Sequence, residues 1–359
     1  MKIKQLAQIS ACGLLGALAL GLDGTGIVTT AAKAAEVEGP KLHWMASAWG
    51  TRRGFTESLE GLVKYVADKT DGRFKIEIKY GEALSPTKEN LDGIQIGAFE
   101  VAQSCALYHP GKTPALTGLD LPFLPIFSLE QRAKVHEAYF ANPVVQAEMG
   151  KWNARFLVSA IMPAYEVMGK GEPPRKIEDW RGMKLQAAGG IGAVMRELGV
   201  TTVTVPSVEL YQSMERGVID GAAQPFTYSF ATYQLDTLAA WMTTDLALGS
   251  PACVSVVNKD AYAKLPDQYK KLLEEAKWPA YEHQINEYTK IDEVNLKRFK
   301  ERGIKGIEID ESVRNKIIES AARKSWNDWV KARTAEGLDG QALLDFILAA
   351  AKDTKDSAN

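Results

Sequence analysis

The sequence predicts an α/β fold of two lobes, on the basis of three patterns in its 359 residues. Alternating apolar and polar residues predict a half-buried strand over Arg73–Tyr80, and apolar residues at helical spacing precede it from Phe55 to Val66. Strand and helix patterns alternate again over residues 156–216. A β-α-β order favours parallel strands covered by helices, and the chain exceeds the usual ~100–200 residues of one domain.

The first 35 residues have the order of a secretory signal peptide. Lys2 and Lys4 precede an apolar stretch over residues 9–22, and small residues follow, among them Ala34 and Ala35. The apolar stretch is shorter than the ~20 residues that cross a bilayer as a helix. We therefore expect export to the periplasm, cleavage near Ala34 or Ala35, and a mature chain that is not embedded in the membrane.

The charge of the chain limits the partners that it can bind, and its cysteines allow one disulfide. The chain has 43 basic and 45 acidic residues, a net charge of −2, and loses three lysines and one aspartate with the leader. A mildly acidic mature chain argues against nucleic acid or an anionic membrane as a partner. Cys105 and Cys253 remain after export, and an oxidising compartment would allow them to form a disulfide or to stay free.

The strands and helices are expected in the following order. Expected strands cover residues 41–46, 73–80, 156–161, 184–187 and 202–205, and expected helices cover residues 55–66, 192–198 and 208–216. No Pro- or Gly-rich linker separates the halves, so we expect the lobes to exchange strands through shared hinges.

A long helical segment from Pro266 to about Arg302 follows, and Pro279 is expected to kink it or divide it in two. Its length of roughly 55 Å exceeds one lobe, so it could brace both. Two or three amphipathic helices are expected over residues 311–352, with Trp326 and Trp329 packed in the core. The predicted organisation is a signal peptide over 1–35, lobe 1 mainly over 36–160, lobe 2 mainly over 161–255, and a spine helix with C-terminal helices over 256–359.

No motif of catalysis or metal binding occurs. The four histidines stand alone, and the chain has no His-Glu-x-x-His pair, nucleophile elbow or Walker loop. We therefore expect no enzyme activity, no cofactor and no metal. The glycines at 189, 190 and 192 follow a predicted strand and open a helix, where backbone N–H groups could bind an anion; a simple tight turn is the alternative.

Aromatic residues gather near the predicted strand ends. Trp49, Tyr108, Tyr165 and Phe226 are expected to line a cleft between the lobes, although core packing is the alternative for each one taken singly.

Two long motifs resemble the DctP-type binding proteins of TRAP transporters. Ile177–Gln186 is similar to the family's segment ending in Gly-x-Lys-x-Arg, and Val205–Gly221 resembles its Glu-x-Tyr…Asp-Gly run. Leu121–Leu124 matches its Leu-Pro-Phe-Leu. The resemblance implies a two-lobed periplasmic-binding-protein fold with hinge strands and a long helix spanning both lobes. It also implies a monomer that closes around a small ligand and delivers it to a separate membrane permease.

The sequence departs from the family pattern at two ligand positions. Gln186 stands where the family usually has an arginine that pairs with a ligand carboxylate, and Gln224 stands where it often has an asparagine. The ligand is therefore an organic acid whose charge is met elsewhere, or a neutral or non-standard compound. Arg52 or Arg53 could provide the missing charge. Asp245 could face the cleft, with a capped turn as the alternative.

Two other functions remain open at this stage. The chain could deliver its ligand to a sensor kinase or an ABC permease, or it could be a periplasmic enzyme that uses Asp245, Glu166 or His109.

Overall fold

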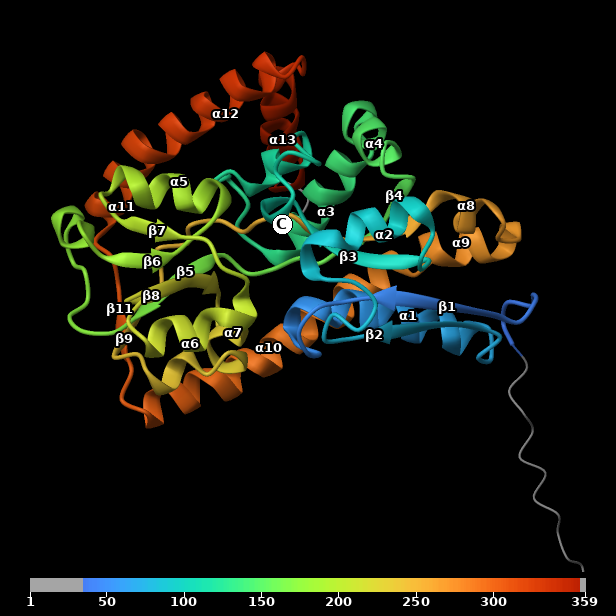
Figure 1. The fold of residues 1–359 in the computed structure, drawn as a ribbon, viewed down its shortest axis with the longest axis horizontal. Helices are drawn as coiled ribbons and strands as arrows, with labels where there is room; N and C mark the ends of the chain where they lie inside the picture. Colours follow the sequence, from blue (N-terminus) through green and yellow to red (C-terminus); the bar gives the residue numbers. More distant parts are fainter. Residues whose placement is uncertain (1–34, 356–359) are drawn as a thin grey trace, which may run out of the picture. The chain divides into compact units, whose positions relative to one another are not determined.

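The computed structural model describes residues 35–355, and the signal peptide predicted over residues 1–35 lies outside them except for Ala35. The described residues form two mixed sheets covered by helices, which confirms the predicted two-lobed α/β fold (Figure 1). We call the sheet of order β2-β1-β3-β10-β4 and its helices lobe 1, and the sheet of order β11-β9-β5-β8-β6-β7 and its helices lobe 2. None of the helices within residues 35–355 is long and apolar enough to span a bilayer.

The strands of lobe 1 are β1 (Leu42–Ser47), β2 (Phe74–Lys79), β3 (Val101–Cys105), β4 (Ala154–Ser159) and β10 (Cys253–Asn258). Those of lobe 2 are β5 (Tyr165–Gly169), β6 (Lys184–Gln186), β7 (Thr201–Val203), β8 (Gly221–Pro225), β9 (Trp241–Thr243) and β11 (Lys305–Ile307). The helices are α1 (Glu57–Lys69), α2 (Asn90–Ile96), α3 (Leu129–Phe140), α4 (Pro143–Gly150), α5 (Gly189–Glu197), α6 (Leu210–Glu215), α7 (Tyr228–Thr232), α8 (Lys259–Ala263), α9 (Asp267–Glu275), α10 (Lys277–Glu301), α11 (Glu311–Ile317), α12 (Arg323–Ala335) and α13 (Gly340–Lys355).

Buried and exposed side chains alternate along β2, as the sequence pattern predicted. Phe74 and Ile76 are buried while Lys75 and Glu77 are exposed, because successive side chains of a strand point to opposite faces. β1 pairs with β2 in parallel, as the β-α-β order through α1 requires. Leu59 and Leu62 of α1 pack with Phe74 in the same core.

The chain passes between the sheets more than once. It leaves lobe 1 after β4, builds β5 to β9 in lobe 2, and returns with β10, which is antiparallel to both β3 and β4. After the long helix it enters lobe 2 again as β11, parallel to β9. The lobes therefore share their connections, as the absence of a linker suggested.

Helix α10 belongs to the cores of both lobes. Tyr281, near its start, packs with the α1 side chains of lobe 1, and Phe299, near its end, packs with Leu210 and Phe230 of lobe 2 (Figure 1). The predicted division of the long helical segment is confirmed, because α9 ends at Glu275 and α10 begins at Lys277. Pro279 lies in the first turn of α10, where a missing N–H costs little.

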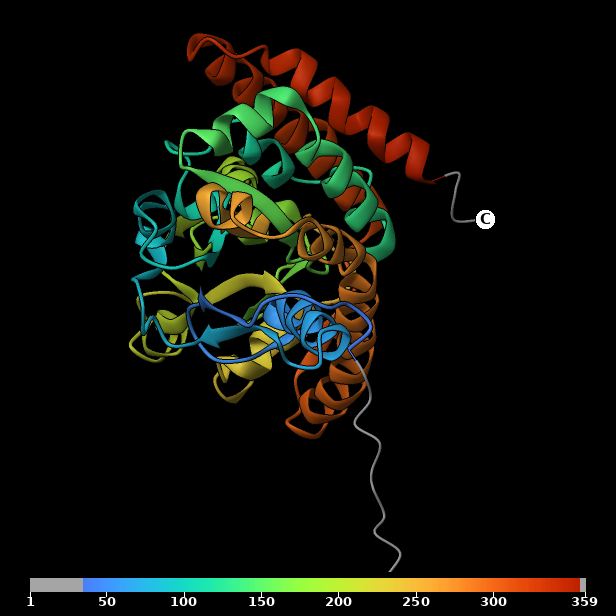
Figure 2. The same ribbon diagram turned by 90° about the vertical axis from the view of Figure 1, so that its right-hand side faces the viewer.

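The C-terminal helices join the lobes on another side. In both views these red helices lie away from the orange α10 (Figure 1 and Figure 2). Ile317 of α11 lies in a lobe 2 core, whereas Ile347 of α13 lies in a lobe 1 core with Trp329 of α12. Trp329 is buried, and the Trp326 indole donates to the Pro122 carbonyl at 2.8 Å. Both tryptophans thus anchor the tail, as predicted.

A disulfide between Cys105 and Cys253 joins the ends of β3 and β10. The two residues are direct partners in the antiparallel ladder and lie 148 positions apart in sequence. Their pairing answers the question that the sequence left open. The bond closes a loop that includes nearly all of lobe 2, and it lies where the chain returns to lobe 1.

We predict that replacing both cysteines by serine lowers the free energy of unfolding by about 2–5 kcal/mol, because the unfolded chain then regains the freedom that the closed loop removes. Urea unfolding of the oxidised wild type and of the double variant measures this difference. Equal free energies of unfolding in the two proteins would show that the bridge does not stabilise the fold.

Candidate functional site

Four of the residues expected in a cleft line one small cavity. Tyr108 lies in a short 3-10 turn after β3, Tyr165 begins β5, Gln186 ends β6, and Gln224 lies near the end of β8. Tyr108 belongs to lobe 1 and the other three to lobe 2. Side chains from both lobes therefore meet at a point where several strands end, which is the usual position of a ligand site in α/β folds.

A hydrogen bond between two buried amides forms the polar centre of the cavity. The Gln224 Nε2 donates to Gln186 Oε1 at 2.8 Å, and the Ser207 hydroxyl donates to Gln224 Oε1 at 3.4 Å. The glutamine residues are 6% and 2% exposed. Because β6 and β8 are parallel neighbours, their side chains can meet across the sheet. The Gln186 Nε2 group has no hydrogen bond within residues 35–355, so it can donate to a solute.

The tyrosines contribute neutral hydroxyl groups. Burial raises the pKa of both Tyr108 and Tyr165 above that of a free phenol. Both therefore remain protonated at physiological pH and offer one donor and two acceptor positions each. The side chains that line this cavity carry no formal charge.

The cavity has a volume of about 20 Å³, room for about one water molecule. Small-molecule sites that enclose an organic ligand are usually ~300–1,000 Å³. A solute larger than water can therefore enter only if the side chains of the two lobes separate.

The lobes touch closely at the start of α5. A Cβ on Gly190 would lie 2.4 Å from the Asp120 carbonyl oxygen and 2.8 Å from Pro122 Cδ, closer than real side chains approach. Gly189 has a φ of +56°, which favours glycine. The glycines that open α5 are thus where lobe 1 contacts lobe 2. The turn needs glycine both for the backbone conformation of Gly189 and for the close contact at Gly190.

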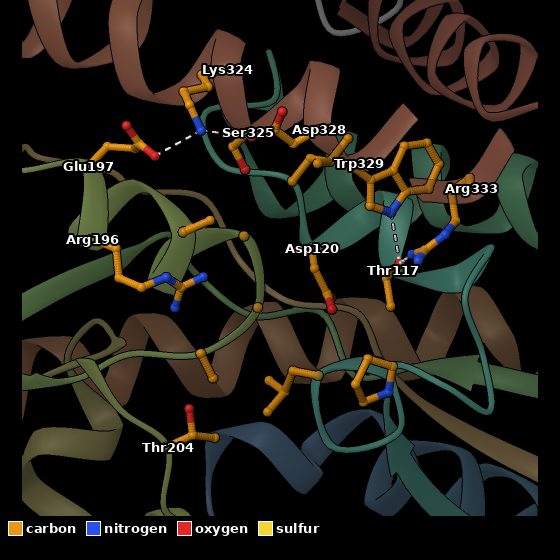
Figure 3. A pocket seen from close by; sticks show the side chains of 17 residues that line it. Thr117, Asp120, Arg196, Glu197, Thr204, Lys324, Ser325, Asp328, Trp329 and Arg333 are labelled. Carbon is orange, nitrogen blue, oxygen red and sulfur yellow. Dashed lines mark hydrogen bonds and ion pairs between the residues drawn. The ribbon is translucent and has the colours of Figure 1, made fainter. Parts of the chain in front are cut away.

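A second cavity of about 620 Å³ lies beside the first and shares Leu107 and Ala188 with it. Figure 3 shows Arg196 and Glu197 from α5 on one side and Lys324, Asp328 and Arg333 from α12 on another, around Asp120. Lys324 forms ion pairs with Glu197 and Asp328, at 2.9 and 2.8 Å. Arg196 donates to the Thr202 hydroxyl at 3.2 Å, and Arg333 pairs with Glu336 at 2.8 Å, so the wall carries charges of both signs.

Asp120 is the buried acid of this region. Its Oδ1 accepts the Ala252 N–H, and burial raises the pKa of its carboxyl to about 8. Ala252 directly precedes β10, so Asp120 ties the returning hinge segment to the loop that α5 contacts.

The other predicted site residues lie elsewhere. Trp49 is buried behind Tyr108, edge-on with ring centroids 6.0 Å apart. Phe226 packs against the Leu210 and Phe230 core of lobe 2. Neither aromatic ring lines the small cavity.

Arg52 and Asp245 have structural partners instead of facing the cavity. The Arg52 side chain is 57% exposed and donates to both oxygens of Glu57, at 2.8 and 2.9 Å. Asp245 is exposed, and its Oδ1 accepts the Ile309 N–H at 2.8 Å, which holds the turn next to β11. Neither side chain lines the small cavity, and the contact of Asp245 matches the capped turn that was its alternative.

Besides Asp245, the residues considered for catalysis are Glu166 and His109. Glu166 accepts hydrogen bonds from the Thr243 hydroxyl and from two backbone N–H groups, of Leu246 and Ala247. Burial raises its carboxyl pKa to about 7, and burial lowers the His109 pKa to about 4. Neither residue lines the two cavities. No cluster of three or more His, Cys, Asp or Glu suited to a metal occurs in the part of the chain that the structure describes.

Sequence reasoning missed one residue of the region and left another undecided. Ser207 was named only as part of the Val205–Gly221 motif, yet its hydroxyl reaches the amide pair. A hydroxyl directly after Pro206 at a helix start is a weak signal that could have marked it. Arg53 was left undecided against Arg52, and the structure separates them by burial, 7% exposed for Arg53.

Comparison with known proteins shows the family and agrees with the two-lobed fold. The model of bacterial extracellular solute-binding protein family 7, DctP, matches residues 45–331. A monocarboxylate 2-oxoacid-binding periplasmic protein of Nostoc sp. is 26% identical over 289 residues, 74% of this chain and 73% of the relative. A marine metagenome TRAP solute-binding protein specific for aromatic acids, crystallised with 3-hydroxybenzoate, is 19% identical with a TM-score of 0.79 over 88% of this chain and 99% of its own. A Bordetella pertussis extracytoplasmic solute receptor that binds pyroglutamic acid is 20% identical with a TM-score of 0.74, over 85% and 99%.

We predict that Asp120→Asn makes stability less dependent on pH. The folded carboxyl has a pKa of about 8 and the unfolded one about 3.8, so the folded state holds this proton more tightly and the free energy of unfolding falls as pH rises from 4 to 8. The slope from this group is at most about 1.4 kcal/mol per pH unit. Asparagine retains the acceptor for Ala252 but does not titrate.

Urea unfolding at pH 5 and pH 7.5 tests this prediction. Burial also raises the carboxyl pKa of Glu148 and of Glu166 to about 7, and these two groups contribute alike in both proteins. The wild type should lose more stability than the variant between these pH values. Equal losses would mean that Asp120 is ionised in the fold.

Proposed function

Because this chain belongs to bacterial extracellular solute-binding protein family 7, we propose that it captures a small polar molecule between its lobes and delivers it to a TRAP permease. The observation that carries this proposal is the meeting of Tyr108 from lobe 1 with Tyr165, Gln186 and Gln224 from lobe 2 at one buried cavity. In the proposed site, the amides and phenols orient the solute by hydrogen bonds, and no residue performs chemistry on it.

Closure around the solute would supply the signal for delivery. Contacts with both lobes stabilise the closed state more than the open one, so the solute shifts the equilibrium between them. The permease would then recognise the surface that exists only when Gly190 of lobe 2 reaches the Asp120 carbonyl of lobe 1. The open state places these groups apart.

Small organic acids are the first solutes to test. Relatives named for what they bind include a 2-oxoacid-binding protein and an aromatic-acid-binding protein. Gln186 cannot pair with a carboxylate as an arginine would, but its amide N–H groups can donate to a carbonyl, hydroxyl or carboxylate oxygen. In this proposal the amide pair therefore recognises a polar group of the solute and leaves its charge to another residue.

The proposed setting is the periplasm. The leader over residues 1–35 would direct export, and the chain would act as a monomer beside the permease. Delivery to a sensor kinase or an ABC permease is the alternative, and the genes next to this one distinguish the two, because a TRAP receptor is expected beside genes for TRAP membrane subunits.

A thermal-shift screen with small acids and their neutral analogues tests the function. A solute that binds only the folded state raises the melting temperature, and at 100 times its Kd it adds about 2.7 kcal/mol of stability. Uptake of a confirmed solute into proteoliposomes that contain the TRAP subunits should require this protein. Uptake at the same rate without it would exclude a role in that transport.

We predict that Gly190→Ala weakens binding of such a solute by about 5- to 150-fold while it leaves the free energy of unfolding nearly unchanged. The added methyl group meets the Asp120 carbonyl of the other lobe, so it opposes closure by the 1–3 kcal/mol typical of overpacking. Within α5 alanine favours the helix.

Gly111→Ala is the matched control, because a Cβ there meets no atom within 4 Å. Isothermal titration calorimetry gives the Kd of both variants. Wild-type affinity in Gly190→Ala would show that binding does not need the lobes to approach this closely.

A further inference from the structure

Asp120 is a buried carboxyl at the contact between the lobes. It is 4% exposed and ends the short 3-10 turn Leu116–Asp120 of lobe 1. Two glycines of lobe 2 lie against it: a Cβ on Gly189 would be 3.7 Å from Asp120 Oδ2, and one on Gly190 would be 2.4 Å from the Asp120 carbonyl oxygen. A titratable side chain of one lobe is therefore covered by the backbone of the other.

The carboxyl has little to compensate a negative charge. Its Oδ1 accepts the Ala252 N–H at 2.5 Å, and Asp120 forms no ion pair within residues 35–355. A carboxylate that is removed from water without a cation is unfavourable, so the group takes up a proton instead. Burial accordingly raises the pKa of Asp120 to about 8, while the Ala252 N–H acts in the opposite direction.

Charged and titratable side chains approach Asp120 from several elements. Burial raises the pKa of Tyr139 of α3 and of Tyr165 of β5, and the charge of Asp120 adds to this rise, so both phenols stay neutral below pH 8. Leu107 and Ala252, which also lie next to this contact, do not titrate. The charged side chains line the larger cavity together with Asp120 (Figure 3), and they are Arg196, Glu197, Lys324, Asp328 and Arg333.

The cations of this cavity have partners other than Asp120. Those partners are Glu197 and Asp328 for Lys324, Glu336 for Arg333, and the Thr202 hydroxyl for Arg196. The positive end of the α5 dipole also favours an anion, but a helix terminus typically changes a pKa by less than about one. Burial has the larger effect, because it raises the pKa of Asp120 from 3.8 to about 8.

Separation of the lobes would change the surroundings of this carboxyl. When Gly189 and Gly190 move away, Asp120 Oδ2 reaches water and its pKa falls toward the ordinary value. The closed protein then holds the proton more tightly than the open one. By thermodynamic linkage, a bound proton favours closure and closure favours uptake of the proton.

We propose that Asp120 is a proton-binding site coupled to lobe closure, so that the protein takes up a proton from solvent when it captures its solute. This inference rests on the proposed function and adds a control of that site by pH. Solute affinity is highest below the pKa that Asp120 has in the open state, falls as pH rises, and levels off above about pH 8. Because one proton is exchanged, the fall is at most about tenfold per pH unit.

Calorimetry in two buffers measures the protons that are exchanged on binding. Phosphate and Tris at pH 7 differ in ionisation enthalpy, so the binding heat differs between them in proportion to the protons taken up. The probes are 3-hydroxybenzoate, L-pyroglutamate and 2-oxobutyrate, whose carboxyl groups stay ionised above pH 6. The Kd is also measured at pH 6 and pH 8.5.

The proteins are the wild type, Asp120→Asn and Glu148→Gln, and thermal melting confirms that each is folded. Glu148 is the matched control, because burial raises its pKa to about 7 but both of its partners, the N–H groups of Ala115 and Leu116, belong to lobe 1. Closure does not change its surroundings.

The wild type and Glu148→Gln should take up part of a proton for each bound probe, and their Kd should rise at least about threefold from pH 6 to pH 8.5. Asp120→Asn should exchange no proton and keep the affinity that the wild type has at pH 6, because an amide resembles the protonated acid. Proton release by the wild type would show that α5 favours the ionised carboxylate. That result, or equal proton uptake by the wild type and Asp120→Asn, would overturn the inference.

Two further outcomes separate the inference from the function on which it rests. A probe that binds the wild type without proton exchange overturns the inference and leaves the binding function intact. If no probe binds, X-ray scattering of the solute-free protein decides the inference alone. A smaller radius of gyration at pH 5.5 than at pH 8.5 in the wild type, absent in Asp120→Asn, supports it, and equal values in the wild type overturn it.

Discussion

The close approach of Gly190 to the Asp120 carbonyl is the constraint on which this account depends. With no side chain between them, the start of α5 can rest directly on lobe 1, and only then do Tyr108 and the Gln186–Gln224 pair enclose one cavity. The surrounding structure supports this contact: α10 contributes to both cores, the disulfide joins β3 to β10, and Asp120 holds the segment before β10. The contacts that hold the two lobes together therefore lie next to the site.

The distribution of charge around the cavity follows from two departures in sequence. An arginine at position 186 would place a cation within the amide network, next to Gln224. With glutamine there, the side chains that line the small cavity carry no formal charge. A solute that contacts both lobes is held firmly only when they close.

Local patterns were sufficient for much of the fold and for part of the site. Alternation over residues 73–80 and the break before Pro279 depend on neighbours in sequence, and both were predicted. Strand ends and family motifs marked Tyr108, Tyr165, Gln186 and Gln224 in the sequence, and the structure places all four on one cavity. Arg52 and Arg53 could not be separated, since Arg53 is buried next to Gly54, on which Tyr228 and Tyr288 pack from distant parts of the sequence. The surroundings of Phe226 and Asp245 are likewise set by distant contacts, because Phe226 packs in the cluster of Phe230 and Asp245 accepts the Ile309 N–H.

Small-angle X-ray scattering with and without a saturating solute tests the central claim of closure most directly. The account predicts that the radius of gyration falls when a solute confirmed by calorimetry is added, because a cavity of about 20 Å³ admits an organic molecule only through an open state. Identical scattering curves for the free and the solute-bound protein would contradict it.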